Sequence, residues 1–289
     1  MKNSFVLSLI KKWSRVLLLA LAVTQVSDTA SAALYAPGDI ATNLTFRARR
    51  TFTHPVGGTN VAVGAEVKLR DFAGRIVFLE WFAVWCPFCT AAVPQVDSGI
   101  VDWYAARGGN PYGVPVFYLF VNQESSSSFQ TQTTSYVNAN LDSSTVVLND
   151  YAAVGGSWLV RPAFQNSGQP IFAIINGVTN SPSHQPWQVL VNYLGFGQTD
   201  FNATLASFRT IIDTVQPPVL APLMTNAKRI GADFEFNFQT QLGRSYRVQG
   251  STNLTSWMTL NTINGTNIPT IFRHTNAPPA RQFYRVVTP

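Results

Sequence analysis

Cysteine and histidine are both scarce in this sequence of 289 residues. The chain contains two cysteines, Cys86 and Cys89, and three histidines, His54, His184 and His274. A structural zinc site needs about four ligands of these kinds, and the histidines are scattered along the chain. The scarcity therefore argues against a zinc site, and we expect neither a metal nor a cofactor.

Charged residues are also few. They make up 12% of the chain, against 46% hydrophobic residues. No run of lysine and arginine is dense enough to indicate nucleic-acid binding. Beyond residue 32, no segment is long and apolar enough to span a membrane. The low charged fraction favours an exported protein, and the length suits one large domain or two ordinary ones.

The first 32 residues have the three-part layout of a secretory signal peptide. Four basic residues precede a short apolar core, residues 16–23, and Ala30-Ser31-Ala32 forms a cleavage site of small residues. We expect cleavage after Ala32 and a mature protein in the periplasm or outside the cell. The alternative is an uncleaved membrane anchor, for which the core is short. No cysteine follows the core, which argues against lipid attachment.

The positive charge is unevenly distributed. The whole chain carries +6, and residues 1–32 account for +3 of it (four basic groups, one acidic), which leaves +3 on the mature chain. Residues 33–216 carry 9 Lys/Arg and 11 Asp/Glu, whereas residues 217–289 carry 7 and 2. The basic C-terminal part predicts contact with anionic surfaces of the cell envelope, such as wall polymers or lipid headgroups. The alternative is an ordinary solvated face.

Residues 33–216 show strands alternating with helices, which predicts an α/β domain. The apolar run at residues 76–82 is typical of a central strand covered on both faces. The other expected strands are residues 41–50, 61–70, 114–121, 144–148, 171–175 and 187–193, and the expected helices are residues 90–106, 125–140, 151–160 and 201–215. Residues 41–50 and 61–70 are expected to form an edge hairpin, and residues 187–193 an edge strand.

The pattern changes at Gln216-Pro217-Pro218. Beyond this point Phe234, Phe236 and Phe238 alternate with polar residues, the period of a half-buried strand. We therefore expect residues 217–289 to form a small all-β, sandwich-like domain. Trp257, which follows a turn at strand spacing, is expected in its core.

The two cysteines are separated by only two residues. A disulfide across so short a loop constrains the unfolded chain little, so exchange chemistry explains the pair better than structural bridging. A helix starting at Pro87 would place Cys86 at its N-terminus, where unpaired N–H groups favour the thiolate. Cys86 is then the attacking thiol and Cys89 the resolving one. The Pro-x-x-x-Thr-x-x-Cys pattern of peroxidatic cysteines is missing before both.

A carboxylate lies inside the apolar run, at Glu80. Burial in a central strand removes its hydration, so its pKa should rise. It is then suited to accept or deliver the proton of Cys89. The alternative is a position near the strand edge, with Glu80 bonded to a backbone group or to Arg75.

Several segments together resemble the thioredoxin-like superfamily, in its exported TlpA/ResA branch, over residues 35–215. They are VKLRDFAGR at 67–75, WCPFC at 85–89, Pro94 five residues after Cys89, and PIFAIIN at 170–176. The resemblance implies that Pro170 is a cis-proline packed against the disulfide and that Gln169 offers backbone hydrogen bonds to a substrate. Family members usually have Thr or Val at the position of Gln169. Pro162 is a competing candidate for the cis-proline, but no apolar strand follows it.

The same resemblance indicates the substrate surface and the partners. In thioredoxins the position of Glu80 is often a buried Asp, and in the TlpA/ResA branch it is commonly Asn. We expect Trp85, Pro87, Phe88, Gln169 and Pro170 to contact substrate, and Trp81 to be a core residue. No charged residue lies between the cysteines, which favours a reductant or isomerase and implies a membrane redox partner.

The sequence thus predicts a mixed thioredoxin-like sheet flanked by helices and followed by a small β sandwich. The C-terminal part resembles short β modules of secreted bacterial proteins through the pattern YRVxxSTNLxxW, residues 246–257. The predicted function is an exported thiol–disulfide oxidoreductase that acts on protein thiols or disulfides. The alternative is a non-enzymatic surface or wall-binding protein with a structural Cys86–Cys89 bridge.

Overall fold

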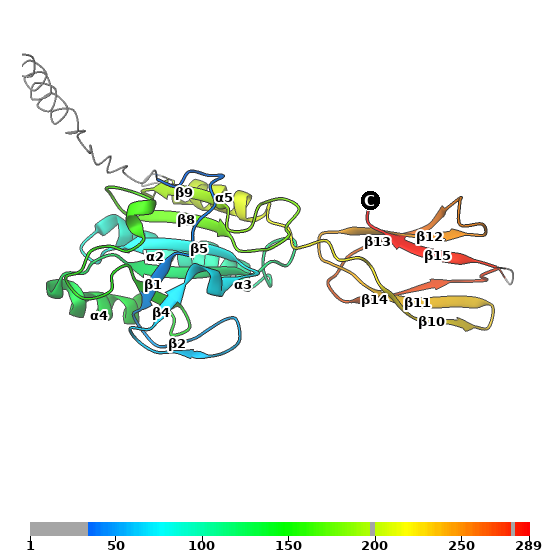
Figure 1. Cartoon of the computed structure of the whole chain (residues 1–289), viewed down its shortest axis with the longest axis horizontal. Coiled ribbons are helices and arrows are strands. Elements are labelled where there is room, and N and C mark those ends of the chain that lie inside the picture. Colours follow the sequence, from blue (N-terminus) through cyan, green and yellow to red (C-terminus); the bar gives the residue numbers. More distant parts are fainter. Residues whose placement is uncertain (1–33, 197–199, 279–280) are drawn as a thin grey trace, which may run out of the picture. The chain divides into compact units, whose positions relative to one another are not determined.

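The structure is a computed structural model that describes residues 34–196, 200–278 and 281–289 (Figure 1). The predicted signal peptide, residues 1–32, lies outside the described residues. In the described ranges, no helix has both the length and the apolar character needed to cross a membrane.

A seven-stranded mixed sheet forms the centre of residues 34–215, with the order β4-β1-β7-β6-β5-β8-β9. The central strand β5 runs parallel to β6 and antiparallel to β8, as the predicted mixed sheet requires. The strands are β1 (Thr45–Ala48), β4 (Glu66–Lys68), β5 (Ile76–Phe82), β6 (Val116–Asn122), β7 (Val146–Asn149), β8 (Ile171–Asn176) and β9 (Val189–Leu194).

All seven residues of β5 are buried, and their side chains alternate between two hydrophobic clusters. Ile76, Phe78 and Phe82 belong to one cluster, and Val77, Leu79 and Trp81 belong to the other. This confirms the prediction of a central strand covered on both faces. Glu80 lies on the same face of the sheet as Phe78 and Phe82, because successive strand residues point to opposite faces.

The three longer α-helices all contribute buried side chains to the cluster that contains Phe78 and Phe82. They are α2 (Pro87–Val96), α4 (Gln130–Asn140) and α5 (Phe201–Ile212). The helix predicted over residues 90–106 is interrupted after Val96, whereas Pro94 lies inside α2. After α2 come a π-helical segment, η2 (Asp97–Asp102), and one turn, α3 (Trp103–Ala105). The other cluster includes Leu69 and Phe72 of the 3-10 helix η1 (Leu69–Phe72).

Two predictions for this region are wrong. Residues 151–160 form no helix; they make a loop held by one isolated bridge between Tyr151 and Trp158. The first hairpin is not entirely at the edge, because β1 pairs with β7 as well as with β4. Residues 60–61 lie in β3 (Asn60–Val61), which pairs with β2 (Phe52–Thr53) in a separate two-stranded sheet.

Residues 224–287 form two three-stranded antiparallel sheets, β10-β11-β14 and β13-β12-β15. Their shared core contains Phe236, Phe238 and Phe272 from the first sheet and Tyr246 and Val248 from the second. The strands are β10 (Met224–Ile230), β11 (Asp233–Gln239), β12 (Ser245–Ser251), β13 (Met258–Asn264), β14 (Pro269–His274) and β15 (Phe283–Val287). This arrangement agrees with the predicted sandwich-like unit.

Trp257 does not belong to this core, contrary to expectation. It is only half-buried, and the Arg285 guanidinium lies 4.2 Å from its ring centroid. Its indole N–H donates to the carbonyl of Leu254. The core is filled by Phe and Tyr side chains from the strands, and Trp257 lies just before β13.

Candidate functional site

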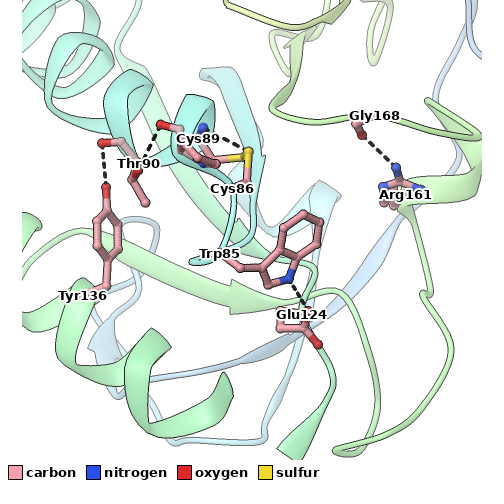
Figure 2. Close-up of a disulfide and its surroundings, with 9 residues drawn as sticks. Trp85, Cys86, Cys89, Thr90, Glu124, Tyr136, Arg161 and Gly168 are labelled. Carbon is pink, nitrogen blue, oxygen red and sulfur yellow. Dashed lines mark hydrogen bonds between the residues drawn. A yellow bond between two sulfur atoms is a disulfide. The ribbon is translucent and has the colours of Figure 1, made fainter. Parts of the chain in front are cut away.

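Cys86 and Cys89 form a disulfide at the start of α2 (Figure 2). Cys86 is the N-cap residue, with an extended backbone, and Pro87 is the first helical residue, as predicted. The Cys86 sulfur accepts a hydrogen bond from the Cys89 backbone N–H at 3.1 Å. Cys86 is 3% exposed and Cys89 is fully buried.

This position favours a reactive first cysteine. The opening turn of a helix presents N–H groups without intrahelical partners, and the helix dipole adds positive potential there. When the pair is reduced, both effects stabilise a thiolate on Cys86. The complete burial of Cys89 has the opposite effect on its own thiolate.

Glu80 is fully buried on the sheet face that α2 covers. Its Oε2 accepts a hydrogen bond from the Tyr118 hydroxyl at 2.5 Å. Its Oε1 has no hydrogen-bond partner within the described part of the chain. Burial raises the pKa of Glu80 to about 8, and the Tyr118 hydrogen bond opposes that rise only in part.

Glu80 is not bonded to Arg75, which was the alternative considered from the sequence. Arg75 donates to the carbonyls of Ala73 and Pro55 rather than to Glu80. Glu80 lies within the central strand, and one of its carboxylate oxygens has no partner among the residues that the structure describes.

A tyrosine links this region to the first turn of α2. Tyr136 of α4 donates its hydroxyl to the carbonyl of Thr90 at 3.1 Å (Figure 2). Burial and the charge of Glu80 both raise the pKa of Tyr136, so the two groups interact electrostatically. Tyr136, Glu80 and the residue after Cys89 thus belong to one neighbourhood.

The predicted substrate residues lie on two segments. The Gln169–Pro170 peptide bond is cis, and Pro170 is buried directly before β8. Trp85 and Gln169 line the same open pocket of about 410 Å³, so the segment before β8 and the residue before Cys86 come together. Phe88 is 49% exposed but does not line this pocket.

Trp81 is buried, as predicted for a core residue. Its indole N–H donates to Asp150 Oδ2 at 3.0 Å, which ties the central strand to the loop that follows β7. Asp150 also accepts hydrogen bonds from the backbone N–H groups of Leu159, Val160 and Arg161. Burial raises the pKa of Asp150 to about 6 against the effect of these bonds.

Sequence reasoning missed four residues of this neighbourhood: Tyr118, Glu124, Asp150 and Trp158. Tyr118 lies within a strand that reads as uniformly apolar, and Glu124 and Trp158 come from loops. The only signal was a lone acidic residue after each of two expected strands, Glu124 after β6 and Asp150 after β7.

No protein-family model matches this chain, and no curated protein is similar to it in sequence. Solved structures do show some similarity. A structure assigned as the thiol:disulfide interchange protein DsbE of Chlorobium tepidum is 19% identical, with 62% of this chain and 99% of that chain covered and a TM-score of 0.43. The thioredoxin domain of a thiol-disulfide oxidoreductase from Bacteroides vulgatus is 13% identical (60% and 98% covered, TM-score 0.37).

A third similar structure is StoA of Bacillus subtilis, which is 15% identical (59% and 98% covered, TM-score 0.37). With identities below 20% and TM-scores below 0.5, these similarities are not used to assign a function to the chain. The functional conclusion rests on the geometry of the site.

Proposed function

We propose that this chain is an exported thiol–disulfide oxidoreductase of the thioredoxin-like type that acts on protein substrates. The observation that carries the proposal is the position of the Cys86–Cys89 disulfide. It lies at the first turn of α2, with the Cys89 N–H directed at the Cys86 sulfur. A bridge that served only to stabilise the fold would gain little from so short a loop.

The reaction transfers two electrons between two pairs of sulfurs. In the reducing direction, the Cys86 thiolate attacks one sulfur of a substrate disulfide, and the other substrate sulfur leaves as a thiolate and takes a proton. Cys89 then loses its proton and attacks Cys86 in the mixed disulfide. The Cys86–Cys89 bond forms, and the second substrate thiol is released. Oxidation of a substrate follows the same steps in reverse.

Glu80 is the proposed proton carrier for Cys89. Its raised pKa, near 8, allows it to hold or release a proton near neutral pH. Its free Oε1 leaves an acceptor for that proton. We assign substrate contact to Trp85, Pro87, Phe88, Gln169 and Pro170, with the backbone of Gln169 pairing with the substrate chain.

The environment of the protein follows from the predicted signal peptide. A reductant or isomerase outside the cytosol needs an electron donor, so a membrane redox partner completes the proposal. Neither Pro87 nor Phe88 carries a charge that would stabilise a thiolate strongly. We therefore expect a reduction potential more negative than about −180 mV, the value typical of disulfide isomerases, measured by equilibration with glutathione or dithiothreitol.

An insulin-reduction assay tests the assignment. The wild-type chain with dithiothreitol should accelerate precipitation of the insulin B chain, and Cys86→Ser should abolish that acceleration. Cys89→Ser should accumulate a mixed disulfide at Cys86, detected by mass spectrometry. A wild-type chain as inactive as Cys86→Ser would instead support the alternative of a structural bridge, which no feature of the site favours.

A further inference from the structure

The open pocket beside Trp85 has a composition that the exchange reaction does not explain. Its residues are Trp85, Gln123, Glu124, Ser125, Gly156, Ser157, Trp158 and Gln169. Trp85 and Trp158 are 48% and 44% exposed, so large areas of two indole rings remain accessible. The pocket volume of about 410 Å³ is ample for one long side chain.

The indole N–H groups of this pocket are already bonded within the protein. The Trp85 N–H donates to Glu124 Oε2 at 2.5 Å (Figure 2), and the Trp158 N–H donates to the carbonyl of Gln123 at 2.7 Å. These bonds fix the orientations of both rings. An occupant therefore meets the rings and not their N–H donors.

The polar group that the pocket offers to an occupant is the carboxylate of Glu124. Gln123 is 4% exposed and its Oε1 is fully buried, so an occupant of the pocket does not reach that atom. Glu124 accepts hydrogen bonds from the Trp85 indole and from the Ser126 N–H. However, none of the ion pairs formed in the described ranges involves Glu124.

A cation beside the pocket, Arg161, already has partners within the protein. The Arg161 guanidinium lies 4.2 Å from the Trp158 ring centroid and donates to the carbonyl of Gly168 at 2.8 Å. Arg161 is 2% exposed, and burial lowers its pKa, an effect that the charge of Asp150 opposes only in part. Arg161 forms no ion pair with Glu124, so the Glu124 carboxylate has no cationic partner within the described residues.

We propose that this pocket binds a lysine or arginine side chain of the substrate protein, one or two residues from the cysteine that reacts with Cys86. The ammonium or guanidinium group would pair with Glu124 and rest against the indole rings of Trp85 and Trp158. Aromatic faces attract cations electrostatically. Because Trp85 precedes Cys86 directly, a bound basic side chain places its neighbouring cysteine at the disulfide.

This inference rests on the proposed function and deepens it to a substrate class. Its test uses the full chain and a series of short disulfide-bonded peptides that differ only in one residue beside the cysteine: Lys, Arg, Gln or Glu. The second-order rate constant of exchange is measured for each peptide. We expect the Lys and Arg peptides to react about tenfold faster than the Glu peptide, the factor that corresponds to about 1.4 kcal/mol.

The ratio of the Lys to the Glu rate within each variant is the decisive quantity. Glu124→Gln keeps the size of the side chain and removes its charge, so the ratio should fall to about one. Trp158→Leu should lower the ratio as well. Glu66→Gln removes an exposed carboxylate from β4 and should leave the ratio at the wild-type value. In the wild type, 0.5 M salt should also reduce the ratio through screening.

The outcomes separate the two proposals. Exchange with the Gln peptide together with equal rates for the Lys and Glu peptides would overturn the pocket inference and leave the proposed function intact. Failure to exchange with any peptide would overturn the proposed function and, with it, the pocket inference. A ratio that stays high in Glu124→Gln would also contradict the assigned site.

Discussion

At the scale of single residues, Glu80 departs most from ordinary core chemistry. A buried carboxylate in a central strand costs free energy unless it is neutral or paired. Here a single hydrogen bond from Tyr118 compensates it, and its pKa rises to about 8. A fold that needed only stability would gain from an apolar residue at this position, because Phe78 and Phe82 on the same face are apolar.

The first prediction concerns exchange kinetics. If Glu80 moves the proton of Cys89, Glu80→Gln should slow disulfide exchange at least about tenfold at pH 7. It should also remove a wild-type inflection near pH 8 in the rate profile. The measurement is insulin or peptide reduction at intervals from pH 6 to pH 9. Identical wild-type and variant profiles over this range would contradict the role of Glu80.

The second prediction concerns stability and follows from linkage. The folded-state pKa of Glu80 lies near 8, above the value of 4.5 for a free side chain, so the folded state binds more protons between these values. Stability should therefore be fully present below about pH 4.5 and fall as the pH rises towards 8. In Glu80→Gln this decrease should be smaller by on the order of 4 kcal/mol. Urea unfolding at pH 5 and pH 8.5 measures the difference.

At the scale of elements, one side chain, Asp150, makes several of the hydrogen bonds that hold the loop after β7. Asp150 follows the last residue of β7 directly and accepts three backbone N–H bonds from residues 159–161, besides the bond from Trp81 of β5. This loop carries Trp158, one wall of the pocket. The pocket is therefore tied to the central strand that leads to Cys86.

We predict that Asp150→Asn loosens this loop. The amide supplies one acceptor where the carboxylate supplies two, so at least one buried N–H loses its partner. The free energy of unfolding should fall by about 2–4 kcal/mol, since hydrogen bonds to charged groups contribute about 1.5–3 kcal/mol each. Urea denaturation at pH 7.5 checks this, with the exposed Asp142→Asn as the matched control. Equal losses in the two variants would contradict the anchoring role.

At the scale of the whole molecule, the exchange site and the β sandwich have separate cores. The cluster that contains both cysteines is built from residues 76–215, and the cluster of the sandwich from residues 234–286. The residues proposed to act in exchange, from Glu80 to Pro170, all lie in the first part. We keep residues 33–216 and 217–289 as the proposed division of the mature chain.

A truncation tests that division. A chain of residues 33–216 should fold and keep exchange activity within about twofold of the full chain, as judged by circular dichroism and insulin reduction. If the basic charge of the β module mediates contact with the envelope, the separate module, residues 217–289, should co-sediment with anionic wall material. Loss of folding in the truncated chain would contradict the domain boundary, and an unbound module would contradict the envelope role.

Much of the α/β part could be predicted from the sequence because its signals are local. The run at residues 76–82 is apolar throughout, and β5 occupies those residues. Pro87 marks the first helical residue after Cys86. The helix expected over residues 151–160 does not form. Gly155 has a φ of 79°, which is incompatible with a right-handed helix, and Asp150 binds the N–H groups of Leu159 and Val160 instead.

The sequence by itself determined the chemistry of the pair, because two cysteines spaced by two residues at a strand-to-helix junction need no distant partner to be recognised. Only the tertiary structure decided what surrounds them. Tyr118 meets Glu80 across neighbouring strands, and Glu124, Trp158 and Gln169 converge on Trp85 from three separate segments. Contacts between residues tens of positions apart depend on how the sheet orders its strands, and local sequence patterns carry no record of that order.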